Sequence, residues 1–258
     1  MSVLALKLLL APSFLVVTSV VARRLGPHIA GILATLPVIA GPILLVVALD
    51  HGRGFGADAA TASLLGLLST TAFVVVYVLV ARHRPWPVAL AGALAAFGAG
   101  TALCSELHIE PVPGLLLAFA GFGLSYALLR VPDEVPGAGW LAPPPWDLPV
   151  RAVCAGGMVV LLTALSSGLG PHLSGLLSTF PIITSVLAAF TQAQRGSAEA
   201  TRLLRGMLLG FFAFAAFCFT VAVSLRSVGI AGAFALASAV TILTQASILG
   251  GGAVGSRA

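Results

Sequence analysis

Nine apolar runs follow one another along the chain, and they constrain its fold more than any other feature. Each is 18 to 23 residues long, close to the roughly 20 residues that a helix needs to cross a bilayer. The sequence therefore predicts an all-α polytopic membrane protein with about nine transmembrane helices. The residues left for loops and tails are too scattered for a soluble domain of about 50 residues or more, which excludes an attached ATPase, kinase or receptor domain. The runs cover residues 3–22, 28–49, 59–81, 86–104, 112–129, 148–166, 172–191, 203–225 and 228–249.

The chain has too few charges to cover a water-facing surface. Only 8% of its 258 residues are charged, against about 25% in soluble domains. The net charge of +5 would suggest nucleic acid as a partner of a soluble protein, but here the charges fall between apolar runs. We therefore expect the lipid bilayer as the partner, with no nucleic acid.

Cysteines and the N-terminal run give no sign of a metal site or a cleaved leader. Cys104, Cys154 and Cys218 lie far apart, each inside or beside an apolar run, without metal-ligand spacing. The first run is too long for the apolar core of a signal peptide and is followed by Arg23 and Arg24. We expect a first membrane helix there, and no cofactor or metal.

An internal repeat organises the chain. Residues 25–39 return as residues 169–183 with an offset of 144, and nine of the fifteen positions are identical. The duplication predicts a first four-helix unit (residues 1–108), a connecting helix and Pro/Gly-rich linker (109–147) and a second unit (148–258). Five spans separate equivalent helices, so the units enter the membrane in opposite directions, as an inverted-topology repeat. If the connecting helix does not fully span, the two copies are parallel instead.

Positive charges suggest the orientation. With the N-terminus outside, ten of the thirteen Lys and Arg residues fall on the cytoplasmic side, as the positive-inside rule favours. We compared both orientations and took the better one. It predicts a multi-pass protein of the bacterial inner membrane with its C-terminus in the cytoplasm.

The second copy contains a short motif that resembles a known family. Its residues are Leu173-Ser174-Gly175-Leu176, Phe180-Pro181, Arg195-Gly196, Glu199-Ala200 and Arg202. They resemble the GlpM-like group of small bacterial inner-membrane proteins, which are single four-helix units. In the first copy Phe55 and Asp58 replace the Glu and Arg after the glycine. The resemblance implies a fused tandem duplication of such a unit.

Two interior prolines mark the candidate site. Pro37 and Pro181 occupy equivalent positions, and a proline inside a helix frees a carbonyl and bends the helix. Such backbone must be shielded by neighbours or line a cavity, and in transporters with inverted repeats it marks the midplane site. The predicted substrate-binding residues are Thr35, Pro37, Ser178, Thr179, Pro181 and Thr184. The alternative is that the small residues serve close helix packing and the prolines only kink the helices.

The equivalent His28 and His172 are candidates for pH-sensitive gates, or for interfacial residues satisfied by nearby backbone. All eight Asp and Glu residues lie at predicted helix ends or in loops. Because no carboxylate is predicted near a helix midpoint, a neutral or anionic polar solute is favoured over a metal cation.

Three function classes remain open. The leading hypothesis is a transporter or permease that works by alternating access between the two repeats, and a homo-oligomer is compatible with it. The second is a non-transporting membrane adaptor or assembly factor. The third, an intramembrane enzyme acting on lipid, needs His83, Glu106, His108 and Glu110 to converge. We expect the chain not to be an enzyme.

Overall fold

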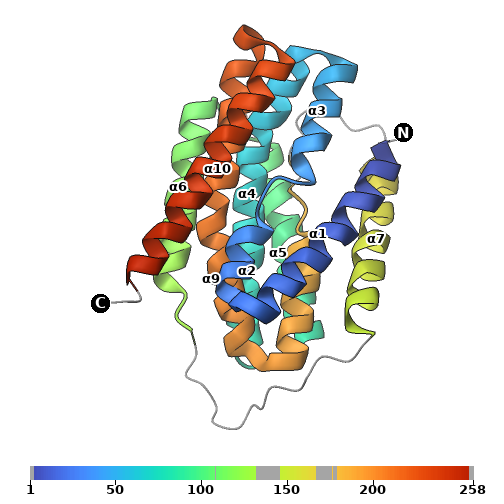
Figure 1. Ribbon diagram of the computed structural model, residues 1–258, viewed down its shortest axis with the longest axis vertical. Coiled ribbons are helices and arrows are strands. Elements are labelled where there is room, and N and C mark those ends of the chain that lie inside the picture. The colour runs from blue at the N-terminus through green and yellow to red at the C-terminus, as the bar shows by residue number, and fades with distance from the viewer. Residues whose placement is uncertain (1–2, 108, 132–145, 167–175, 177–178, 256–258) are drawn as a thin grey trace.

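The fold is taken from a computed structural model, which describes residues 3–107, 109–131, 146–166, 176 and 179–255. All regular structure in this part of the chain is α-helical, and the helices form an elongated bundle (Figure 1). The helices are α1 (Val3–Leu25), α2 (Pro27–Ala34), α3 (Ala40–His51), α4 (Arg53–Ala81), α5 (Trp86–Ser105), α6 (Pro111–Leu128), α7 (Asp147–Ser166), α9 (Ile182–Val228) and α10 (Ile230–Gly255).

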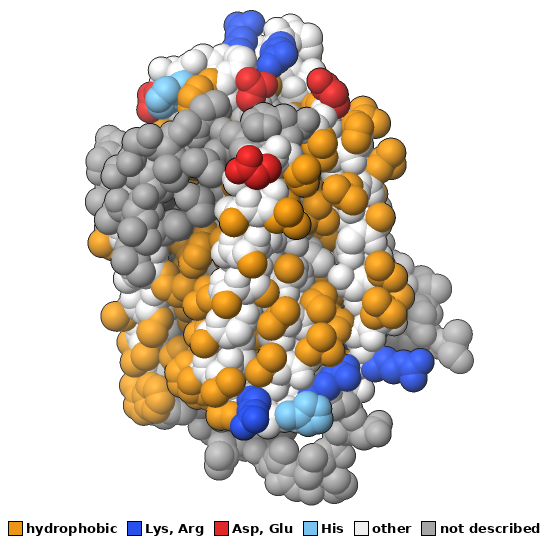
Figure 2. Space-filling view, turned by 180° about the vertical axis from the view of Figure 1, so that it is seen from behind, with side chains coloured by type: hydrophobic (Ala, Val, Ile, Leu, Met, Phe, Trp, Pro, Cys, Tyr) orange, Lys and Arg blue, Asp and Glu red, His pale blue; other side chains and the backbone are white. Residues whose placement is uncertain are grey.

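Five of these helices are long and apolar enough to cross a membrane: α4, α5, α6, α9 and α10. Figure 2 shows one face on which hydrophobic side chains cover the middle while charged side chains gather at the two ends. Large apolar side chains point outward, and Leu103 and Val153 are 70% and 74% exposed. An apolar surface of this kind is compatible with a membrane protein.

Two predicted helix boundaries are wrong. The run 28–49 is not one helix, because residues 35–39 separate α2 from α3. Pro37 explains this break: it has no N–H to donate, and its ring disfavours helical backbone at the residue before it. Helix α4 starts at Arg53, six residues before the predicted start.

The runs 172–191 and 203–225 also differ from the prediction. The helix α9 continues from Ile182 through both, and Gly196 is the one non-helical residue inside it (φ 86°, ψ 175°). Its first segment is therefore 182–195 and its second 197–228. Residues 167–175 and 177–178 lie outside the described residues.

Glycine turns precede both of the longest helical segments. Gly52, between α3 and α4, has φ 91° and ψ 169°, close to the dihedrals of Gly196 between the two segments of α9. Residues with a β-carbon are strained in this region. Gly52 and Gly196 are 144 residues apart, so the chain reverses at both places by the same glycine-dependent turn.

The core lies along α4 and the second segment of α9. Tyr77, Phe73 and Leu64 of α4 are fully buried and share one hydrophobic cluster with Leu204 of α9. Helix α7 lies beside α1 (Figure 1), and Leu15 belongs to a smaller cluster with residues of α7 and the start of α9. The long helices thus hold the broken segments between them.

Candidate functional site

The first break, residues 35–39, satisfies its free backbone groups with protein partners. The Thr35 hydroxyl donates to the Ile32 carbonyl at 2.7 Å, and the Gln245 amide of α10 donates to the same oxygen. The Val38 N–H donates to the Leu36 carbonyl at 2.7 Å. The carbonyl that the end of α2 leaves unpaired is therefore bonded without water, as a site inside a bilayer requires.

The second break, before α9, repeats this bonding pattern. The Thr179 hydroxyl donates to the Leu176 carbonyl at 2.8 Å, and the Ile182 N–H donates to the Phe180 carbonyl at 2.8 Å. From α4, the Thr70 hydroxyl donates to the Thr179 carbonyl at 2.9 Å. Each of the two threonine bonds and each of the two tight turns has its equivalent 144 residues away.

Each break packs against a long helix of the other predicted unit. A β-carbon added at Gly210 of α9 would overlap the Thr35 hydroxyl, and one added at Gly66 of α4 would overlap the Thr179 hydroxyl. Each of these glycines is 14 residues beyond its glycine turn, near the middle of a long helical segment. The structure thus brings the first break to α9 and the second break to α4.

Most predicted substrate-binding residues lie in or beside these breaks. Thr35, Thr179 and Thr184 are no more than 8% exposed, and Pro37 and Pro181 lie within or directly before a helix start. The Thr35 and Thr179 hydroxyls are engaged as donors within their own helix ends. Ser178 lies outside the described residues, so its placement is not part of this site.

The predicted gating residue His28 lies in the first turn of α2, far along the helix from the break. It is near Arg202 and Arg205, and its backbone carbonyl packs where Gly206 has no side chain. Its equivalent, His172, lies outside the described residues. His28 therefore belongs to a charged end of the bundle.

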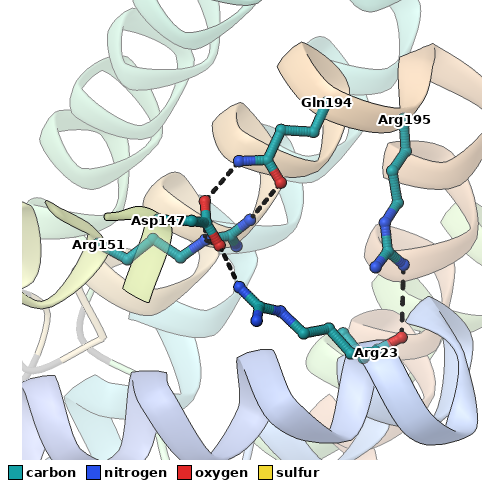
Figure 3. A network of polar contacts seen from close by, with 6 residues as sticks. Arg23, Asp147, Arg151, Gln194 and Arg195 are labelled. Atoms are coloured by element: carbon teal, nitrogen blue, oxygen red, sulfur yellow. Dashed lines mark hydrogen bonds and ion pairs between the residues drawn. The ribbon is translucent and has the colours of Figure 1, made fainter. Parts of the chain in front are cut away.

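A buried ionic cluster at that end was missed by the sequence reading, which placed Asp147 in a loop. Asp147 is the first residue of α7 and is fully buried (0% exposed). Arg23 of α1 donates to its carboxylate at 2.6 Å, Arg151 donates at 3.0 Å, and the Gln194 amide of α9 also donates to it. Figure 3 shows these side chains directed at the carboxylate from three helices. The i,i+4 spacing of Asp147 and Arg151 was the available signal.

The cluster holds excess positive charge and ties the two predicted units together. Arg195 donates to the Ala22 carbonyl of α1 at 3.4 Å. Asp147 lies before the apolar part of α7. Burial alone raises its pKa, but hydrogen bonds from Gln194, Arg151 and Arg23 outweigh that effect, and the pKa is lowered. Asp147 is therefore an ionised link between α1 of the first unit and α7 and α9 of the second.

A pocket of about 280 Å³ lies at the opposite end of the bundle. On α4, Asp58 of the pocket is 23 residues before Ala81, whose carbonyl accepts from Gln192 near the ionic cluster, so the two ends are roughly 35 Å apart at 1.5 Å per helical residue. Its lining residues are Ala57, Asp58, Thr61, Ala62, Leu65, Ile109, Glu110, Pro111, Ala222 and Arg226.

The residues suggested for an intramembrane enzyme do not converge. His83 precedes α5 and Glu106 follows it, so a helix of 20 residues, about 30 Å long, separates them. His108 lies outside the described residues. Among the residues described, no group of three or more His, Cys, Asp or Glu side chains is arranged to hold a metal ion.

Comparison with known proteins assigns no family. No protein-family model matches the chain, no curated protein matches it, and no solved structure matches it. The resemblance to the GlpM-like group therefore stays a prediction.

Proposed function

We propose that the chain is a membrane transporter for a small neutral or anionic polar solute, working by alternating access between two inverted repeats. One observation carries the proposal: the predicted units are joined at one end by the buried Asp147 cluster, while the other end contains a pocket. A carrier that opens to one side at a time needs such a difference between its ends.

The two breaks support a site near the middle of the bundle. Both expose non-helical backbone at equivalent positions, and both meet the middle of a long helix from the other unit. Leu65 of the pocket directly precedes Gly66, against which the second break packs. The pocket therefore approaches the break from one end of the bundle.

The proposed membrane arrangement has nine crossings. In it α2 and α3 form one broken crossing, and the second break with the first segment of α9 forms its inverted equivalent. The matching turns at Gly52 and Gly196 support the 4+4 repeat. We further propose that the chain is a fused pair of GlpM-like units in the bacterial inner membrane, with its N-terminus outside.

Uptake by reconstituted protein tests the function. The full chain in liposomes should take up at least one of four labelled solutes: L-alanine, glycerol, lactate or inorganic phosphate. Pro37→Ala and Pro181→Ala restore an N–H at each break and should abolish this uptake, whereas Pro87→Ala, at the start of α5, should leave it unchanged. Uptake equal to wild type in both break variants would remove the breaks as the site.

A non-transporting adaptor is the second candidate, and one observation favours it. Gly31 of α2 packs on the Leu203 carbonyl and Gly206 of α9 packs on the His28 carbonyl, so the two helices touch backbone to backbone. Such close packing suits a rigid assembly. Folded wild-type protein that transports none of the four solutes would favour this alternative.

A further inference from the structure

We propose that the pocket between α4, α6 and α9 is the entry site for a small zwitterion, a molecule with one ammonium and one carboxylate group. The inference rests on the proposed transport function and names its substrate class. A zwitterion has no net charge, so it belongs to the neutral polar solutes proposed above.

The size of the pocket limits the solute. Its volume of about 280 Å³ is just below the usual range for ligand pockets, about 300–1,000 Å³. It therefore suits a molecule much smaller than a nucleotide or a lipid headgroup with its chains.

The depth of the pocket directs the solute toward the second break. Ala62 and Leu65, on its inner wall, are buried and pack against Leu176. The Leu176 carbonyl accepts the Thr179 hydroxyl. A solute on this wall therefore lies one layer of side chains from the backbone of the break.

Charges at the pocket rim favour a molecule with two opposite charges. Arg226 of α9 donates to the Asp58 carboxylate of α4 at 2.7 Å. A guanidinium has five N–H donors, so Arg226 retains donors for a carboxylate. Glu110 forms no ion pair within the described residues and is available to an ammonium group. A simple anion would meet two carboxylates and a simple cation would meet Arg226, whereas a zwitterion pairs with both.

The remaining lining groups fit the same ligand. The Thr61 hydroxyl donates to the Ala57 carbonyl at 3.0 Å, which leaves its oxygen as an acceptor for an ammonium group. Ile109 and Ala222 offer apolar contact to a short carbon chain.

This charge pattern occurs at one end of the bundle. Counting 144 residues on from Asp58 gives Arg202, and counting 144 back from Arg226 gives Arg82. Both equivalents are cationic, so the repeat does not reproduce the opposite charges at the other end. Arg82, which donates to the Arg130 carbonyl, is therefore a matched control for Arg226.

Calorimetric titration of the full chain in lipid nanodiscs tests the pocket, with L-alanine as the probe and ethylamine and propionate as single-charge probes. Wild type should bind L-alanine more tightly than either single-charge probe. Glu110→Gln and Arg226→Gln should each weaken L-alanine binding by about fivefold or more, because a rim ion pair contributes up to about 1 kcal/mol. Glu106→Gln, a carboxylate outside the pocket lining, and Arg82→Gln should bind as wild type.

The outcomes separate this inference from the transport proposal. No L-alanine binding by folded wild type, or ethylamine binding as tight as L-alanine binding, overturns the zwitterion site. Uptake of L-alanine that is unchanged in Glu110→Gln and Arg226→Gln also overturns the site, but leaves transport standing. Binding that depends on Glu110 and Arg226, without uptake of any solute, supports the site and removes transport.

Discussion

Gly210 of α9 lies directly against the hydroxyl of Thr35, so the first break touches a helix that begins more than 140 residues later. The equivalent contact joins Gly66 of α4 to Thr179 of the second break. These two contacts hold both breaks in the bundle, and the first prediction tests them.

Replacing Gly210 or Gly66 by alanine should destabilise the protein. The new β-carbon meets a threonine hydroxyl and a backbone carbonyl, so the expected loss is about 1–3 kcal/mol, as for other overpacked cores. Gly98→Ala is the control, since its β-carbon meets nothing within 4 Å. Thermal unfolding in detergent measures all three variants, and equal midpoints for Gly210→Ala and Gly98→Ala would contradict the contact.

The glycine turns give a second prediction. Gly52→Ala and Gly196→Ala should each lower the free energy of unfolding by about 1–3 kcal/mol, because alanine is strained at a φ near +90° with extended ψ. Nothing lies within 4 Å of either added β-carbon, so the cost comes from the backbone alone. Gly54→Ala, inside α4 and also uncrowded, should be neutral or stabilising. A turn that tolerates alanine as well as Gly54 does cannot have this conformation.

The buried ionic cluster gives a third prediction. Asp147→Asn leaves the buried Arg151 without its carboxylate, and breaking a buried pair costs about 3–5 kcal/mol. Asp58→Asn breaks an exposed pair, which contributes about 0–1 kcal/mol. Chemical denaturation of both variants should therefore show a large loss only for Asp147→Asn. Similar losses in the two variants would mean that Asp147 is solvated.

The same carboxylate predicts a pH dependence. The pKa of Asp147 is lowered in the folded protein from its ordinary value of 3.8. Its contribution to stability is therefore fully present above that ordinary value and is lost as the pH falls through the lower folded pKa. The difference in stability between wild type and Asp147→Asn should be constant from about pH 5 to pH 8 and should shrink below about pH 4. A difference that changes near neutral pH would contradict an ionised Asp147.

Sidedness is the fifth prediction. With Cys154 replaced by serine, a cysteine at Glu106 should react with an impermeant maleimide added outside whole cells. A cysteine at Ala138, in the linker between the units, should react only after the membrane is opened. Labelling of both positions from outside would exclude the inverted arrangement, because α6 would then not cross the membrane.

The helices and the breaks were largely predictable because their signals are local. Apolar runs set most helix positions, and Pro37 and Pro181 marked the two breaks correctly. The start of α4 was missed because Arg53 and Asp58 are charged, although an end turn at the edge of a bilayer tolerates such residues.

The ionic cluster and the pocket were not predictable in the same way. Asp147 is buried only because Arg23, 124 residues earlier, and Gln194, 47 residues later, reach the same point in space. No local pattern carries that information. The pairing of Asp58 with Arg226, 168 residues apart, depends on tertiary packing in the same manner.

The hydrogen bond from Gln245 to the Ile32 carbonyl joins residues 213 positions apart. During synthesis, the first broken helix enters the membrane long before the residue that completes its bonding exists. At about 5–20 residues per second, the ribosome needs on the order of 10 to 40 s to reach Gln245. The first unit therefore waits in the bilayer with an incompletely bonded carbonyl, and the last helix to be made finishes the fold of the second one.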